Sequence, residues 1–260
     1  MKGAEYDDEQ LEIPKRLTER YQERVDKMKL YNQDCLPAMK EMPDNAYDLA
    51  IVDPPYGIGA DIVKETKRVR HTKYNKGNAI RKGYSKKWDV KPPKEYFDEL
   101  FRVSKNQIIW GANYFIEYLR NSSCFLIWDK MQSFTGADFE LAFSSFDSSC
   151  KAFRMTRIEA YSSGDWRSVH GSKIHPTQKP VALYKWLLTK YAKPGQTILD
   201  THLGSMSSVI ACIDMGYSIT GYEVDKEYFD NGVSRVQRHL SQGRLFGLDF
   251  NLDIHYNEKK

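Results

Sequence analysis

The chain has 260 residues, of which 41% are hydrophobic, and its formal net charge is +4 at pH 7. This length and composition predict a globular α/β or similar domain with a sizeable core, and the modest charge alone identifies no class of partner. The sequence contains no apolar run near the ~18 residues of a membrane span, and its polar, acidic start differs from a signal peptide. We therefore expect an intracellular protein that does not contact a membrane.

Cysteine and histidine are spaced in a way that argues against disulfides and metal binding. The six histidines show no ligand spacing, and the sequence has no Cys-x-x-Cys pair. We expect reduced, structural cysteines and no metal site. The cysteines are Cys35, Cys124, Cys150 and Cys212.

The first thirteen residues are acidic and poor in apolar residues, which predicts a loose arm. Apolar residues then recur at helical spacing over residues 14–29, and Pro14 suits a first helical turn. We expect this helix to pack on the core, because apolar stripes usually mark burial. An interface in a homodimer is the alternative role for this helix.

Residues 29–59 predict a βαβ unit with an acid after each strand. The first strand covers residues 29–31 and precedes Asp34, and a helix over 36–41 leads to the apolar strand that ends at Asp53. Two prolines follow Asp53, and because proline lacks a backbone N–H the chain must leave the sheet there. Both carboxylates should therefore lie at the carboxyl edge of one sheet, where α/β proteins bind ligands.

The segment 61–94 differs sharply from the residues before it. It contains twelve Lys and Arg but only three acids, together with Tyr74, Tyr84 and Trp88. Such a basic segment could follow a phosphate backbone and stack bases on its rings. The alternative is a solvated surface loop, but its place just after the candidate site favours contact with nucleic acid.

The middle of the chain predicts a helix over 95–103, a helical link over 114–119 and three strands over 107–110, 125–128 and 139–143. The segment 144–174 is rich in Ser and Gly and has weak periodicity. It is a second candidate for substrate contact.

The last part of the chain predicts a second βαβ unit, with helices over 181–191 and 207–215 and strands over 197–200 and 218–222. Gly216 is placed to end the second of these helices. Asp200 and Glu223 end the strands, about 20 residues apart, with the small residues Gly204 and Ser205 in the turn between them. This pattern is typical of a nucleotide-binding unit, although an ordinary βα turn remains the alternative because Met206 stands where a second glycine is expected.

Three motifs occur in order: Asp53-Pro-Pro-Tyr56, His175-Pro-Thr-Gln-Lys-Pro180 and Asp200-x-x-x-Gly204-Ser205. Together they make the chain resemble the DNA amino-methyltransferases that act on adenine N6 or cytosine N4, in the permuted β-type order found in phage and restriction–modification enzymes. The resemblance implies a Rossmann-like, doubly wound α/β fold with a mostly parallel sheet. It also implies one methyltransferase domain over residues 1–260, with 61–94 and 144–174 as inserted target-recognition segments.

The resemblance implies S-adenosylmethionine as cofactor and DNA as partner, in the cytoplasm of a bacterial or phage-infected cell. It assigns catalysis to Asp53, Pro54, Pro55 and Tyr56. It assigns cofactor binding to Asp34, Thr177, Gln178, Lys179, Asp200, Gly204, Ser205 and Glu223, with Asp34 near the adenine, Glu223 on the ribose and 177–179 near the amino-acid end. The chain departs from the family at Thr201-His202 and Met206, where Pro-Phe and Gly are usual, so the geometry of the cofactor loop is left open.

The residues of the first motif suit methyl transfer to an amino group. Asp53 and the Pro54 carbonyl can accept the two N–H bonds of a target amino group as its lone pair becomes available, and Tyr56 can stack on a flipped base. Asp rather than Ser at the head of the motif favours adenine N6 over cytosine N4, by analogy with the family. Methylation of RNA and an inactive nucleic-acid-binding homologue are also open, while the basic segment argues against a protein substrate.

Overall fold

A computed structural model describes residues 22–59, 88–131, 137–162, 174–175, 177–241 and 252–257. Its strands are β1 (Met28–Asn32), β2 (Tyr47–Val52), β3 (Ser104–Trp110), β4 (Cys124–Asp129), β5 (Phe139–Ser144), β6 (Lys151–Arg154), β7 (Thr197–Asp200), β8 (Ser218–Tyr222) and β9 (Asp253–Tyr256). Its α-helices are α2 (Cys35–Glu41), α3 (Lys94–Val103), α4 (Arg157–Ser162), α5 (Val181–Tyr191), α6 (Ser207–Met215) and α7 (Lys226–Ser241). Two 3₁₀ turns, η1 (Ala112–Tyr114) and η2 (Ile116–Tyr118), follow β3.

The described strands form one sheet in the order β6-β4-β5-β3-β2-β7-β8-β1-β9. All neighbouring strands run parallel except around β5, which is antiparallel to both β3 and β4. The parallel strands therefore bring their carboxyl ends to one edge. Because β5 runs the other way, its first residues lie at that same edge.

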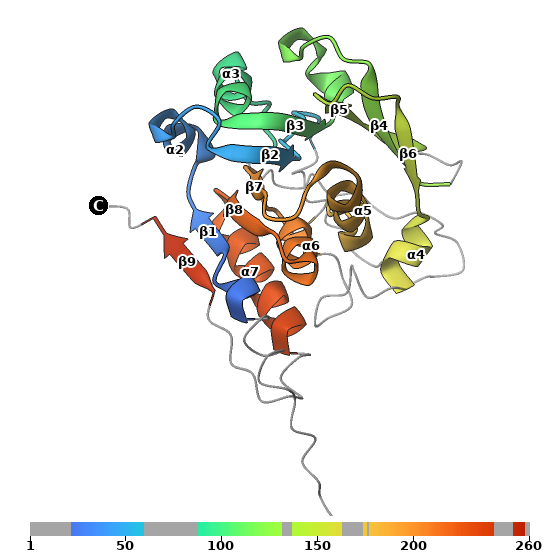
Figure 1. Cartoon of the computed structure of the whole chain (residues 1–260). Coiled ribbons are helices and arrows are strands. Elements are labelled where there is room, and N and C mark those ends of the chain that lie inside the picture. Colours follow the sequence, from blue (N-terminus) through green and yellow to red (C-terminus); the bar gives the residue numbers. More distant parts are fainter. Residues whose placement is uncertain are drawn as a thin grey trace, which may run out of the picture.

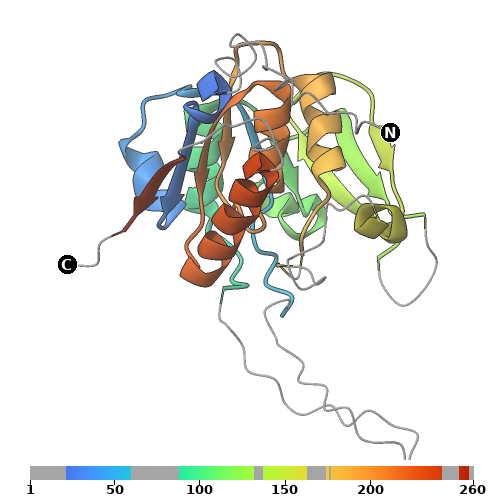
Figure 2. The same ribbon diagram turned by 90° about the horizontal axis from the view of Figure 1, so that it is seen from below.

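Helices cover both faces of this sheet, as Figure 1 shows with α2 and α3 on one side and α5, α6 and α7 on the other. Figure 2 views the molecule with α7 (orange to red) in front of the strands. Each face has its own hydrophobic core: Leu30, Ile51 and Trp110 pack with α5 to α7, whereas Val52 and Ile109 pack with α2 and α3. The predicted doubly wound α/β fold is confirmed.

Local sequence signals account for most of these elements. The four residues at the end of β2 are fully buried, and α3 buries the stripe Tyr96, Phe97, Leu100 and Val103 at helical spacing. Gly216 ends α6 with φ +79° and donates its N–H to the carbonyl of Cys212. The elements α5, β7, α6 and β8 occupy the residues predicted for them.

One prediction differs from the structure. The helix predicted over 14–29 is helical only at 22–25 among its described residues, because Met28 and Leu30 alternate into the core as part of β1; residues 14–21 lie outside the described residues. In the segment 144–174, which is predicted to contact the substrate, the described residues include β6, which joins the sheet beside β4, and α4. None of the described helices is long and apolar enough to span a membrane.

Candidate active site

A cavity of about 320 Å³ lies at the carboxyl edge of the sheet, where β1, β2, β7 and β8 end. The neighbouring strands β2 and β7 enter this edge from different halves of the chain, which is the arrangement that binds ligands in open α/β sheets. Eleven of the twelve predicted site residues line the cavity. They are Asp34, Asp53, Pro54, Pro55, Tyr56, Thr177, Gln178, Lys179, Gly204, Ser205 and Glu223.

Asp53 is held in place by two donors at the end of β2. The Tyr56 hydroxyl donates to its Oδ1 at 2.6 Å, and the Lys179 ammonium donates to its Oδ2. Burial raises the pKa of Asp53 above its ordinary value, while the Lys179 ammonium acts in the opposite direction. The side chain keeps an exposed fraction of 14%, so the carboxylate is oriented but still reachable from the cavity.

The ammonium of Lys179 faces Asp53 and Glu140, although the sequence placed this residue near the amino-acid end of a cofactor. Lys179 is 3.1 Å from Glu140, and Glu140 is 2.8 Å from Lys130. Burial alone lowers the pKa of Lys179, but Asp53 and Glu140 outweigh it and raise that pKa. Glu140 was not anticipated from the sequence. It reaches the site because antiparallel β5 begins at this edge of the sheet.

Tyr56 is packed more closely than the predicted role in base stacking implies. Its ring stacks on Tyr114 with centroids 4.9 Å apart and meets Phe115 edge-on. A Cβ atom on Gly111 would lie 2.2 Å from Cε1 of Tyr56, so the ring packs directly on this glycine. In this conformation Tyr114, rather than a base, covers the ring of Tyr56.

This packing predicts that Gly111→Ala destabilises the fold and displaces Tyr56. Gly111 has φ +75°, so alanine adds backbone strain of about 1–2 kcal/mol and an overpacking cost of about 1–3 kcal/mol. Gly195→Ala is the matched control, because Gly195 has φ +84° and a Cβ atom there would meet nothing within 4 Å. Urea unfolding should show the larger loss for Gly111→Ala; equal losses would show that the contact with Tyr56 is unimportant.

The loop after β7 is organised by acids and by Arg235. Glu223 accepts the backbone N–H of Gly204 at 2.8 Å and of Asp225 at 2.9 Å, and burial raises the pKa of Glu223 to about 7. Arg235 on α7, which the sequence did not single out, donates to the Ser205 carbonyl at 2.7 Å. Asp200 does not line the cavity: its buried carboxylate accepts the Ser208 hydroxyl at 2.5 Å and a backbone N–H of the loop.

Met206 points away from the cavity. Its side chain is fully buried and packs against Gly232 on α7, where a Cβ atom would lie 2.7 Å from Cγ of Met206. Its backbone has φ 58°, the left-handed conformation that suits the glycine usual at this position. The departure at Met206 therefore preserves the turn and fills the core, and it does not narrow the cavity.

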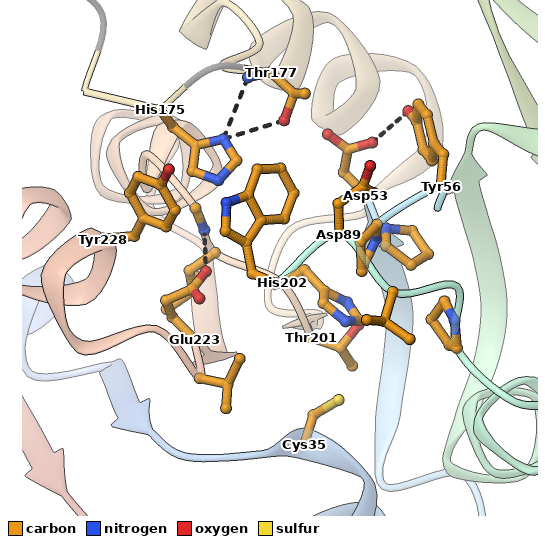
Figure 3. Close-up of a pocket in the computed structure, with 18 of the residues that line it drawn as sticks. Cys35, Asp53, Tyr56, Asp89, His175, Thr177, Thr201, His202, Glu223 and Tyr228 are labelled. Atoms are coloured by element: carbon orange, nitrogen blue, oxygen red, sulfur yellow. Dashed lines mark hydrogen bonds between the residues drawn. The ribbon is translucent and has the colours of Figure 1, made fainter. Parts of the chain in front are cut away.

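Aromatic side chains close the opposite wall of the cavity. The rings of His175 and Tyr228 lie 4.3 Å apart, and Trp88 contacts both. Figure 3 shows His175 and Tyr228 facing Asp53 and Tyr56 across the cavity. Trp88 belongs to the segment predicted to contact nucleic acid, but here it lines the cavity, and residues 61–87 lie outside the described residues.

The turn after Tyr56 is tied to this wall by Asp89. Its carboxylate accepts the N–H groups of Gly57 at 2.8 Å and Ile58 at 2.9 Å. The Nε1 atom of Trp88 is buried without a hydrogen-bond partner among the residues that the structure describes. An unpaired buried donor lowers the stability of the fold, unless a ligand accepts a hydrogen bond from it.

Comparison with known proteins agrees with this geometry. The family model of the N6/N4 DNA methylases matches residues 62–234. The chain belongs to the N6/N4 DNA methylase family. Among its relatives in this comparison, the type II methyltransferase M.HpaI of Haemophilus parainfluenzae is 23% identical, over 82% of this chain and 75% of that protein. The protein YubD of Escherichia coli (strain K12) is 26% identical, over 81% of this chain and 92% of YubD.

Solved structures share the fold of this DNA methylase. TTHA0409 of Thermus thermophilus, in complex with S-adenosyl-L-methionine, is 14% identical with a TM-score of 0.53, covering 90% of this chain and all of that one (100%). The cytosine-N4-specific PvuII DNA methyltransferase is 10% identical with a TM-score of 0.52, covering 89% of this chain and 97% of that one. The predicted family and fold are confirmed, and methyltransferases of this fold use S-adenosylmethionine.

Proposed function

We propose that this protein transfers a methyl group from S-adenosylmethionine to the N6 amino group of adenine in DNA. The observation that carries the proposal is Asp53, an oriented carboxylate at the end of β2 that opens on a cavity suited to the cofactor. Membership in the DNA methylase family supports DNA as the substrate. Asp instead of Ser at the head of the motif supports adenine as the base.

The described residues fit the cofactor. A cavity of about 320 Å³ is of the size that holds such a ligand, and the buried Nε1 donor of Trp88 needs an acceptor. Glu223 would accept the ribose hydroxyls, Gly204 and Ser205 would lie against the cofactor backbone, and Asp34 would lie near its adenine. Thr177 and Gln178 would lie near its amino-acid end. The bound cofactor would supply an electrophilic methyl group on a sulfonium.

The protein would make the amino nitrogen of adenine a better nucleophile. As the nitrogen attacks, its lone pair leaves the ring and positive charge develops on the amine, whose hydrogens Asp53 and the Pro54 carbonyl can accept. Tyr56 and Lys179 hold the Asp53 carboxylate for this task. After transfer the cofactor would leave as S-adenosylhomocysteine, and water would take the excess proton of the methylated amine.

Cofactor affinity should depend on pH through Glu223. Ribose hydroxyls donate to the ionised carboxylate, so binding lowers the pKa of Glu223 from about 7 in the free protein and is weakened when this group is protonated. We expect S-adenosylhomocysteine to bind about tenfold more weakly at pH 6 than at pH 8. Calorimetric titration of Glu223→Gln should give a flat profile, whereas the exposed Glu41→Gln should keep the wild-type slope. A slope that survives in Glu223→Gln would assign the titration to another group.

Transfer of labelled methyl from S-adenosylmethionine to unmethylated duplex DNA, followed by nucleoside analysis, tests the proposed reaction. N6-methyladenine supports it, and label in N4-methylcytosine would replace the base but keep the mechanism. Label found only when RNA is offered would change the substrate. A protein that binds DNA without binding cofactor would be an inactive homologue.

A further inference from the structure

A chain of hydrogen bonds leads from a buried tyrosine to the cavity. The Tyr96 hydroxyl on α3 lies 2.6 Å from Oγ1 of Thr201. Oγ1 of Thr201 in turn lies 3.0 Å from Nδ1 of His202. Tyr96 is 2% exposed, and its ring meets that of His202 edge-on at 5.4 Å. Thr201 and His202 form the wall of the cavity just after β7, on the side of Cys35 (Figure 3).

The direction of these hydrogen bonds follows from the single proton that each hydroxyl group can donate. A buried hydroxyl must donate its proton, and Thr201 Oγ1 is the acceptor within reach of Tyr96 among the described residues. Thr201 then donates its own proton to Nδ1 of His202, which must be unprotonated. Burial lowers the pKa of His202 to about 3, so the ring is neutral near pH 7 and carries its proton on Nε2.

This Nε2–H group is available to a ligand. Within the part of the chain that the structure describes, the hydrogen bonds of His202 are made by Nδ1 and by the backbone N–H. A neutral donor suits a neutral acceptor, which a purine ring nitrogen provides. The neighbouring acid, Glu223, accepts hydrogen bonds in its ionised form and so suits hydroxyl groups instead.

We propose that His202 donates a hydrogen bond from Nε2 to a ring nitrogen of the cofactor adenine, with its tautomer set by Tyr96 and Thr201. The proposal rests on the cofactor binding proposed above. The family usually has Phe at this position, which can only make apolar contact. The departure at Thr201-His202 would therefore add polar recognition of the purine to the cofactor site.

Binding of S-adenosylhomocysteine and its 1-deaza, 3-deaza and 7-deaza analogues tests the proposal. In wild type, one analogue should bind about threefold to tenfold more weakly than the parent compound, and His202→Phe should bind the parent and that analogue equally. Identical relative affinities in both proteins would overturn the proposal. If the wild type does not bind S-adenosylhomocysteine, the proposed function itself fails.

The tautomer can be measured without cofactor. Long-range ¹⁵N–¹H NMR of His202 should show a proton on Nε2 in the free wild type, and Tyr96→Phe should move part of the population to Nδ1–H. Addition of S-adenosylhomocysteine should shift the Nε2–H resonance of the wild type. A proton found on Nδ1 in the wild type would overturn the inference even if the cofactor binds.

Discussion

Asp53→Asn should slow methyl transfer by roughly 10- to 150-fold from the loss of a charged hydrogen bond alone, while the affinity for S-adenosylhomocysteine stays near that of wild type. Asp53 would act on the amino group as positive charge develops, so the loss falls on the transition state and not on cofactor binding. Glu140 still neutralises Lys179 in this variant, and we expect it to fold. Single-turnover rates on DNA, together with calorimetric affinities, separate the two effects.

Asp98→Asn is the matched control for this substitution. Asp98 lies on α3, has an exposed fraction of 58% and pairs with Lys94 one helical turn away. Loss of such a pair changes stability little, and transfer should proceed at the wild-type rate. An Asp53→Asn enzyme as fast as wild type would contradict the assignment of Asp53 as the acceptor of the amine hydrogens.

Lys179→Met should damage both stability and the pH profile. It leaves Asp53 and Glu140 facing each other at a site where the Lys179 side chain is only 1% exposed. Breaking a buried ion pair by removing one partner lowers the free energy of unfolding by about 3–5 kcal/mol. Because Lys130 still pairs with Glu140, we expect a loss of about 3 kcal/mol. Urea unfolding at pH 8 measures this loss.

Lys179→Met should change the pH dependence of both the rate and the stability in a definite direction. Lys179 opposes the rise in the pKa of Asp53, so its removal raises that pKa further and moves the acid limb of the pH–rate profile to higher pH. Asp53 then has a higher pKa in the folded state than in the unfolded state. The stability deficit should therefore be largest at high pH and shrink as pH falls toward about 4.

Lys185→Met provides the comparison for this pair of effects. Lys185 on α5 is 43% exposed and pairs with Asp214, away from the cavity. We expect it to change stability by less than about 1 kcal/mol and to leave the pH–rate profile in place. If Lys179→Met behaves like Lys185→Met, the ion pair with Asp53 has no role in holding the catalytic carboxylate.

Local patterns were enough to predict the acids at the edge of the sheet. Apolar runs that stop at Asp53, Asp200 and Glu223 mark strands, and Pro54 and Gly216 mark where an element must end, because their backbone constraints act within a few residues. Parallel strands joined by helices have their carboxyl ends together. The sequence therefore determined the fold class and the convergence of Asp34, Asp53 and Glu223 on one cavity.

The tertiary structure alone decided which charges face Asp53. The direction of β5 depends on pairing with β3 and β4, and it brings Glu140 to the cavity edge. The side chain of Lys179 pairs with Glu140 and Asp53, and not with residues next to it in the sequence. Tertiary packing also decides that Trp88 lines the cavity. These contacts join residues far apart in the chain, and their geometry comes from packing, which local periodicity does not encode.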